Sequence, residues 1–231
     1  MKGVIIPNED KWIYEWFEIE NTTPNDVLNA LPTDNSPVEV VINSGGGDVY
    51  SGSEIYTALK DYPGTVTVKI VGIAASAASV IAMAGDRVLI SPTAQIMIHN
   101  VASVAQGDYR VMKHEAEVLK NYNKSIANAY MLKTGLSQEE LLNLMDKETW
   151  LNAQQAKEKG FVDEIMFDEG NRLVASVQVG VLPQNVINKM RNMKNELMQK
   201  SKTNQDDNEI KLAKARLKLK TLEVENYVKK R

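Results

Sequence analysis

Cysteine is absent from this 231-residue sequence, and histidine occurs only twice. Without cysteine the chain forms no disulfide, no thiolate metal site and no cysteine nucleophile. This composition fits a reducing compartment, and we expect a cytoplasmic protein. A nucleophile must therefore be another residue type, and a histidine base must be one of two positions.

The sequence also lacks a long apolar run and an excess of basic residues. Its longest apolar stretch, around Ile73–Ala84, is interrupted by serines and is too short to span a bilayer. The net charge is -3 and the pI is near 5.6, whereas nucleic acids and membrane surfaces usually require a basic patch. We therefore expect neither a nucleic-acid partner nor a membrane partner.

Short apolar runs rich in β-branched residues alternate with helical stretches from Pro37 to about Met166. This alternation indicates an α/β domain with crossover connections. Pro37–Asn43 is typical of a buried strand, and we expect a turn of small residues at Ser44–Asp48 and a helix through Tyr50–Leu59. The first unit is therefore strand, glycine turn and helix.

A second unit repeats this order, with a strand at Thr65–Val71, a small-residue turn at Gly72–Ser79 and an apolar helix at Val80–Ala84. Two further short strands are expected at Arg87–Ile90 and Gln95–His99.

The later part of the domain is mainly helical. A long helix is expected at Gly107–Lys133, with Gly135 as its C-terminal cap because glycine lacks a Cβ. Ser137 and Glu140 form a capping-box pattern at the start of the next helix. Phe161–Phe167 is typical of a late strand.

The composition changes after Pro183 to Lys, Asn, Gln, Glu and scattered Leu. Apolar residues recur at heptad-like spacing from Val186 to Leu197. We expect a core domain over residues 1–182 and a charged tail over residues 183–231. The tail is either helical and used in assembly, or solvated and partly disordered.

Ser76 is the first candidate for a nucleophile. It lies in GIAASAAS, after a predicted strand and at the opening of a helix, where backbone N–H groups lack intrahelical partners. A serine hydroxyl needs a base to remove its proton and fixed donors to hold the resulting oxyanion. Alanine and serine runs also permit close helix packing, and Ser79, one turn deeper, suits that role better.

His99 is the candidate base, because it ends the apolar run IMIH and a strand would deliver it to a loop. His114 lies among charged residues of a helix, where a structural role is the simpler interpretation. The triplet Gly45–Gly47 can present amides that no side chain blocks, which is compatible with an oxyanion hole. A phosphate-binding loop would look similar, but no Walker-type lysine follows the triplet.

Four segments resemble, in the same order, those of the proteolytic subunit family of Clp proteases: INSGGGDVYSG, GIAASAAS, QIMIHN and ETWLNAQQAKEKGFVDEIM. The resemblance covers about Pro37 to Met166. It implies a ClpP/crotonase-like α/β core of repeated strand-helix crossover units. It also implies a serine endopeptidase that acts on protein or peptide substrates without a metal or other cofactor, and that forms a homo-oligomeric ring through the long helix.

Matched by position, the resemblance implies Ser76 as the nucleophile and His99 as the general base. It implies the backbone amides of Gly46 and Ala77 as the oxyanion hole. The proline that precedes the glycine pair in the family is Gly45 here, which loosens the turn but keeps the amides available.

The family's third triad residue, an aspartate, corresponds to Glu148. Glutamate can orient an imidazole as aspartate does, but its extra methylene requires the backbone to lie farther back. Asp146, two residues upstream, is the alternative acid.

The segment ahead of the first crossover is short and leaves little room for the loop and helix by which the family engages a Clp-type ATPase. A Clp-like core with a short front and a charged tail resembles the head-maturation proteases of tailed bacteriophages, which trim capsid or scaffold proteins. Two rival interpretations stay open. One is a crotonase-like acyl-CoA hydratase or isomerase, which needs carboxylates near the hole and no Ser-His pair; the other is a non-catalytic assembly or scaffolding module on the same fold.

Overall fold

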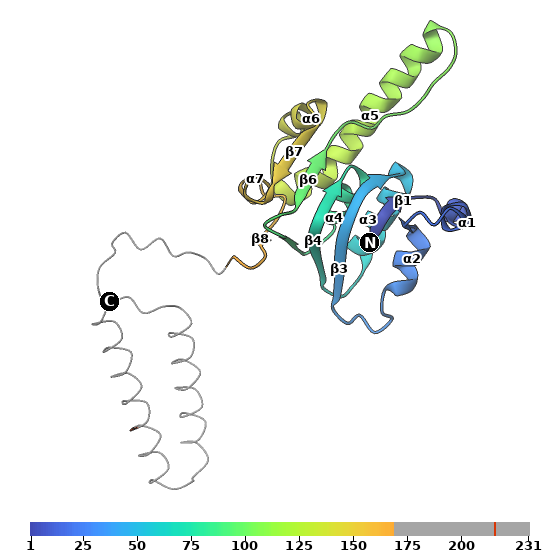
Figure 1. Cartoon of the computed structure of the whole chain (residues 1–231). Coiled ribbons are helices and arrows are strands. Elements are labelled where there is room, and N and C mark those ends of the chain that lie inside the picture. The colour runs from blue at the N-terminus through green and yellow to red at the C-terminus, as the bar shows by residue number, and fades with distance from the viewer. Residues whose placement is uncertain (169–214, 216–231) are drawn as a thin grey trace. The chain divides into compact units, whose positions relative to one another are not determined.

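The computed structural model describes residues 1–168 and Ala215 (Figure 1). Its strands are β1 (Lys2–Ile5), β2 (Asn21–Thr22), β3 (Val38–Gly47), β4 (Val66–Ala75), β5 (Arg87–Ile90), β6 (Gln95–Ile98), β7 (Thr149–Asn152) and β8 (Glu164–Ile165). Its helices are the 3-10 turn η1 (Asn8–Asp10), α1 (Lys11–Trp16), α2 (Pro24–Ala30), α3 (Val49–Asp61), α4 (Ala77–Ala82), α5 (Tyr109–Thr134), α6 (Gln138–Asp146) and α7 (Ala153–Glu158).

One mostly parallel sheet organises the described residues. Its strand order is β2-β1-β3-β4-β5-β8, and β6 pairs with both β4 and β7. Strands β3, β4 and β5 are parallel neighbours, whereas β7 runs antiparallel to β6. Parallel neighbours need crossover connections, and α3 and α4 provide the two at the centre of the sheet. The predicted α/β core of strand-helix crossover units is confirmed.

The central strands and their crossover helices form the core. In β4, Val66, Val68 and Ile70 are buried while the residues between them are half-buried, as expected for a strand whose side chains alternate between faces. Ile55 of α3 and Ile81 of α4 are fully buried in the same cluster. Burial of each such side chain stabilises the fold by about 1.5–3 kcal/mol.

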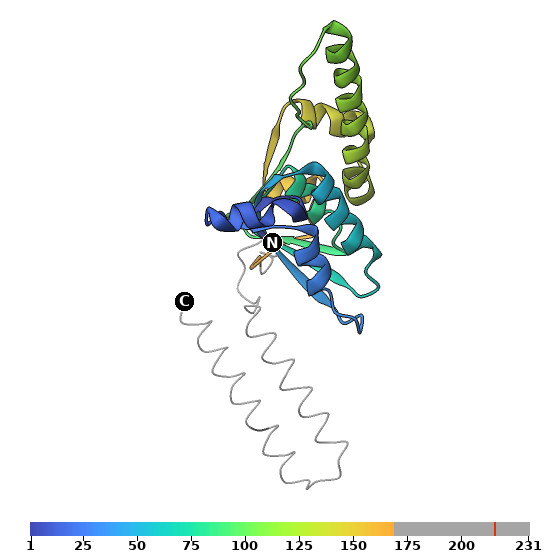
Figure 2. The ribbon, with the colours of Figure 1, turned by 90° about the vertical axis from the view of Figure 1, so that its right-hand side faces the viewer.

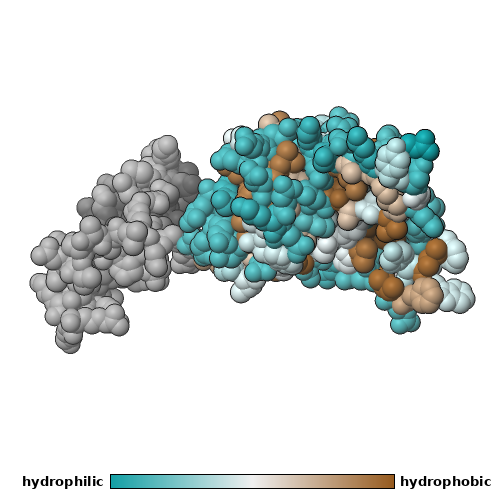
Figure 3. Space-filling view, turned by 90° about the horizontal axis from the view of Figure 1, so that it is seen from above, coloured by the Kyte–Doolittle hydropathy of each residue, from teal (hydrophilic) through white to brown (hydrophobic). Residues whose placement is uncertain are grey.

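Helix α5 is the longest helix of the described part, and its N-terminal half extends away from the sheet (Figures 1 and 2). Its buried residues lie between Ile126 and Tyr130, in its second half. The predicted C-terminal cap is confirmed, because Gly135 has a φ of 73°. The predicted capping box of Ser137 and Glu140 is also confirmed. Seen from the end at which α5 projects, the surface is mainly hydrophilic, with apolar residues in separate small groups (Figure 3).

Two predicted turns are wrong over most of their length. The glycine triplet continues as strand, and Gly72–Ser79 divides into the end of β4, a turn at Ser76 and the start of α4, which begins before the predicted Val80. Strand β3 runs through the glycine triplet, where Gly46 and Gly47 pair with β1. Strand β4 runs on through Ile73–Ala75, which pairs with β6. Small residues at these positions therefore extend the sheet up to the helix starts. The late strand predicted at Phe161–Phe167 is also shorter than expected, because only the two residues of β8 pair there.

The predicted tail lies outside the described residues, apart from Ala215, and so does its predicted boundary with the core at residues 182 and 183. Across the part of the chain that the structure describes, no helix combines the length and the apolar character needed to cross a membrane.

Candidate active site

Ser76 occupies the turn between strand β4 and helix α4. Its φ and ψ are 53° and -127°, a combination that is costly for any residue with a Cβ. Nucleophilic serines between a strand and a helix are known to adopt such a sharp, strained turn. The Ser76 amide donates to the carbonyl of Met97 at 3.0 Å, and its carbonyl accepts from the amides of Ser79 and Val80. Neighbouring backbone therefore holds this turn from both sides.

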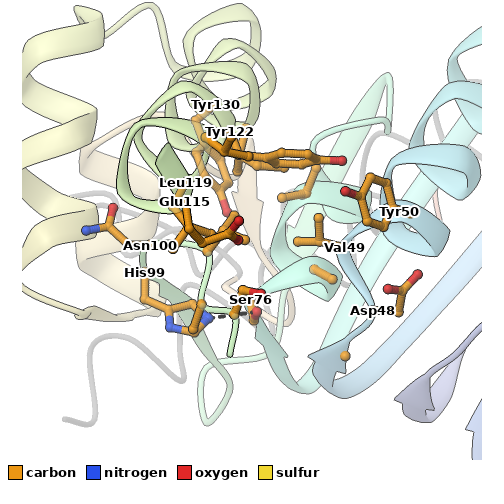
Figure 4. A pocket seen from close by; sticks show the side chains of 18 residues that line it. Asp48, Val49, Tyr50, Ser76, His99, Asn100, Glu115, Leu119, Tyr122 and Tyr130 are labelled. Carbon is orange, nitrogen blue, oxygen red and sulfur yellow. Dashed lines mark hydrogen bonds between the residues drawn. The ribbon is translucent and has the colours of Figure 1, made fainter. Parts of the chain in front are cut away.

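The imidazole of His99 contacts the Ser76 hydroxyl (Figure 4). Nε2 of His99 lies 2.8 Å from Oγ of Ser76. His99 directly follows β6, and the pairing of Ala75 with Met97 brings the ends of β4 and β6 together. Sheet register therefore places the two side chains side by side. With its proton on Nδ1, the imidazole accepts the hydroxyl proton at Nε2, which is the geometry that general-base activation requires.

The other candidate serine and histidine lie away from this contact. Ser79 is buried, and its Oγ donates to the Ser76 carbonyl at 2.6 Å and accepts from the Tyr130 hydroxyl at 2.7 Å. Burial raises the pKa of the Tyr130 phenol, which keeps it protonated as that donor. His114 lies on the exposed surface of α5. Ser79 therefore supports the turn, as its predicted packing role implies.

Glu148 directly precedes β7 as His99 directly follows β6, but its side chain does not hydrogen-bond to His99. Thr149, the next residue, pairs with Ile98 in the antiparallel β6–β7 ladder, so the backbones of Glu148 and His99 lie opposite one another just beyond that pair. Glu148 is exposed, has a φ of 48°, and accepts a hydrogen bond from the Trp150 indole at 3.3 Å.

Asp146 is bound to a different partner. Its Oδ1 accepts a hydrogen bond from the Asn100 side chain at 2.7 Å. Val101, which follows Asn100 in the chain, donates its amide to Oδ1 of Asn123 on α5 at 2.8 Å. These two contacts tie the segment after His99 to helices α5 and α6. Within residues 1–168, neither candidate carboxylate hydrogen-bonds the imidazole.

The Gly46 amide is already bound within the sheet. Gly46 is buried, and its N–H donates to Ser44 Oγ at 3.1 Å, while that hydroxyl donates to the Gly3 carbonyl at 2.6 Å. The Ser44 hydroxyl thus bridges β3 and β1 where their register shifts. Gly46 instead provides space: a Cβ on it would lie 2.7 Å from the Cβ of Ser76.

The neighbouring Gly47 amide has a different environment. Gly47 is exposed and lines the same cavity as Ser76. The amide of the next residue, Asp48, donates to the Ile5 carbonyl of β1 at 2.8 Å. Successive amides of a strand face opposite sides, so the Gly47 N–H faces away from β1. Ala77 is the first residue of α4, and its N–H has no acceptor within the helix.

A cavity of about 450 Å³ opens beside Ser76 and His99 (Figure 4). Its walls are the start of α3, the start of α4, the segment after His99 and one face of α5. This volume is in the range of ligand-binding pockets. In the described part of the chain, no group of three or more His, Asp or Glu side chains could hold a metal ion.

We predict that Gly46→Ala destabilises the protein and that Gly45→Ala does not. Gly46 has a φ of 93°, and an added Cβ would lie 2.6 Å from the Ala75 carbonyl oxygen, whereas a Cβ on Gly45 meets nothing within 4 Å. Strain and overpacking at Gly46 should lower the free energy of unfolding by about 2–3 kcal/mol. Urea denaturation of both variants measures the difference. Equal stability of the two would contradict this account of the turn.

Comparison with known proteins gives consistent matches. A family model described as Clp protease matches residues 17–169. The ATP-dependent Clp protease proteolytic subunit 1 of Chlamydia abortus is 34% identical over 142 residues, which cover 59% of this chain and 73% of that protein. The ATP-dependent Clp protease proteolytic subunit of Bacteroides fragilis is 32% identical over 164 residues, which cover 68% of this chain and 79% of that protein.

A solved structure of a ClpP1 mutant from Listeria monocytogenes is similar with a TM-score of 0.56 and 26% sequence identity. The similarity covers 74% of this chain and 92% of that chain. The family model matches well over half of the sequence and includes the segments that bear Ser76 and His99. This chain therefore belongs to the Clp protease family of serine peptidases.

Proposed function

We propose that the protein is an endopeptidase in which Ser76 attacks the peptide carbonyl and His99 accepts its proton. The observation that carries this proposal is the 2.8 Å contact between Oγ and Nε2 beside an open cavity. His99 then protonates the leaving amine, and water hydrolyses the acyl-enzyme with the same base. The Ser-His contact also argues against the acyl-CoA interpretation, whose chemistry uses no such pair.

For the oxyanion we propose the amides of Ala77 and Gly47. The sequence resemblance implies Gly46 at the second position, but the Gly46 amide donates to Ser44 while Gly47 is exposed in the cavity. We therefore assign the second oxyanion-hole amide to Gly47, one residue after the position that the resemblance implies. Two fixed amides at a developing negative charge supply the electrostatic stabilisation on which acyl transfer depends.

For the third catalytic group we propose Glu148. The β6–β7 register supports this choice, because it brings the backbone of Glu148 opposite that of His99. Asp146 is a weaker candidate because it is bound to Asn100. The Glu148 side chain must leave the Trp150 indole to reach Nδ1 of His99, where a carboxylate stabilises the imidazolium that forms during attack.

Ser76→Ala and His99→Ala should each lower kcat/KM for a short fluorogenic peptide by at least about 1,000-fold, because the two residues act as one unit. The double variant should lose no more than about twofold beyond either single variant. His114→Ala, which changes the other histidine on an exposed surface, is the control and should retain activity. Independent, multiplicative losses would refute the assignment.

Glu148→Ala should lower kcat by about 100-fold, less than the loss in Ser76→Ala, because the carboxylate orients the base without reacting. Asp146→Ala should change kcat by less than about threefold. Steady-state hydrolysis of the same peptide measures both variants. The opposite order of effects would assign the role to Asp146.

We further propose that the protein cleaves protein or peptide substrates as a homo-oligomeric ring. The relatives from Chlamydia abortus and Bacteroides fragilis are named as subunits of ATP-dependent proteases, which supports assembly with further subunits. The same names make a Clp-type ATPase the partner class to test.

A narrower proposal is the processing of phage capsid or scaffold proteins. Its support is the charged segment beyond residue 169, where the matched family model ends. Incubation of wild-type and Ser76→Ala protein with assembling phage capsid and scaffold proteins tests it. Cleavage by the wild type alone is the expected result. Equal particle assembly with no cleavage by either protein would favour the scaffolding interpretation.

A further inference from the structure

The cavity beside Ser76 has an acidic lining that the proposed catalytic groups do not use. Helix α5 supplies one wall through residues spaced three, four or seven apart, which places them on a single helix face. Val118, which is exposed, also lines the cavity; the residues at this spacing are, from the inner end outward, Tyr130, Ile126, Tyr122, Leu119 and Glu115. The first two are buried and the others half-buried, so the wall changes from an apolar floor to a carboxylate.

Glu115 differs from the other charged residues in the first half of α5. Lys113, Glu117 and Lys120 are exposed, whereas Glu115 is half-buried. In Figure 4 its side chain extends from α5 into the cavity on the side of Ser76. Within residues 1–168 its carboxylate takes part in none of the ion pairs or side-chain hydrogen bonds. A cationic group of a ligand can therefore pair with this carboxylate without displacing an existing contact.

Asp48 brings a second negative charge to the facing wall. Its Oδ2 accepts hydrogen bonds from the amide and the hydroxyl of Ser51, each at 2.7 Å, and this contact caps α3. Burial, the adjacent Tyr50 and the charge of Asp48 together raise the pKa of the Tyr122 phenol. Tyr50 and Tyr122 pack edge to face with ring centroids 5.4 Å apart. Aromatic and aliphatic surface therefore lies between the two carboxylates.

No lysine or arginine lines this cavity. Besides the two carboxylates, its titratable groups are the phenols of Tyr50, Tyr122 and Tyr130 and the imidazole of His99, which is neutral when it acts as the base. We propose that the cavity binds the side chain on the amino side of the cleaved bond and selects lysine or arginine there. This inference rests on the proposed peptidase function. The aliphatic stem of the substrate side chain packs on Leu119 and Tyr122, and its cationic head lies near Glu115. An acidic side chain meets two like charges and is excluded.

The test compares short fluorogenic peptides that differ only in the residue before the cleaved bond: lysine, arginine, leucine or glutamate. The full-length wild type should cleave the lysine and arginine peptides with kcat/KM about tenfold above the leucine peptide, and the glutamate peptide least. Glu115→Gln should lower kcat/KM for the two basic peptides by about tenfold and leave the leucine peptide within about twofold. Glu117→Gln is the matched control, because this exposed residue on the same helix pairs with Lys120 and does not line the cavity.

Two results would overturn the selectivity while leaving the peptidase assignment intact. One is a wild type that cleaves the leucine or glutamate peptide as well as the basic ones. The other is a Glu115→Gln variant that loses activity equally on all peptides, with a changed oligomeric state in gel filtration, which would make Glu115 an assembly residue. If the wild type cleaves none of the peptides faster than Ser76→Ala does, the proposed function fails and the selectivity fails with it.

Discussion

The strained turn at Ser76 is the constraint on which the site depends. A non-glycine residue with a φ of 53° costs about 1–3 kcal/mol, and the structure offsets that cost on both sides of the turn. Before it, β4 is paired on both sides, with β3 on one and with β5 and β6 on the other; after it, every residue of α4 is buried. Gly46 leaves the space that the turn occupies. The hydroxyl is thus held at the helix start by the core of the domain.

Sheet register extends this constraint to the rest of the site. Ser76 and His99 are 23 residues apart in sequence, yet the β4–β6 pairing brings them into hydrogen-bond contact. The β6–β7 ladder ends at the pair of Ile98 and Thr149, so the backbones of His99 and Glu148 follow directly beyond it. Each proposed catalytic group therefore follows or precedes a paired strand, which makes their relative positions a property of the fold. Much of the cavity wall, by contrast, comes from the start of α3 and one face of α5, which lie outside these strand pairings.

Local patterns in the sequence predicted much of the fold. The helix caps at Gly135 and Ser137 and the strand before His99 follow from short-range chemistry, and all are confirmed. The turn predicted at Ser44–Asp48 is wrong, because the partner that extends β3 is β1, a short strand with little periodicity of its own. The turn predicted at Gly72–Ser79 is wrong because pairing with β6 extends β4.

The site was also predicted only in part, because some of its features depend on strand pairing and on the cavity, which local sequence patterns do not specify. The Ser76–His99 contact followed from motifs, whereas the choice between the amides of Gly46 and Gly47 depends on which side of a strand each faces. Glu115 was not identified, because a single acidic residue on a charged helix carries no signal until the cavity beside it is known.

The central claim is that the Ser76 hydroxyl is activated by His99. Reaction of the full-length protein with a fluorophosphonate, followed by mass-spectrometric mapping of the modified peptide, tests it most directly. The account predicts one adduct, on the peptide that contains Ser76 and at that residue, and almost none when His99 is replaced by alanine. An adduct at Ser79, or labelling of Ser76 that persists without the imidazole, would contradict it.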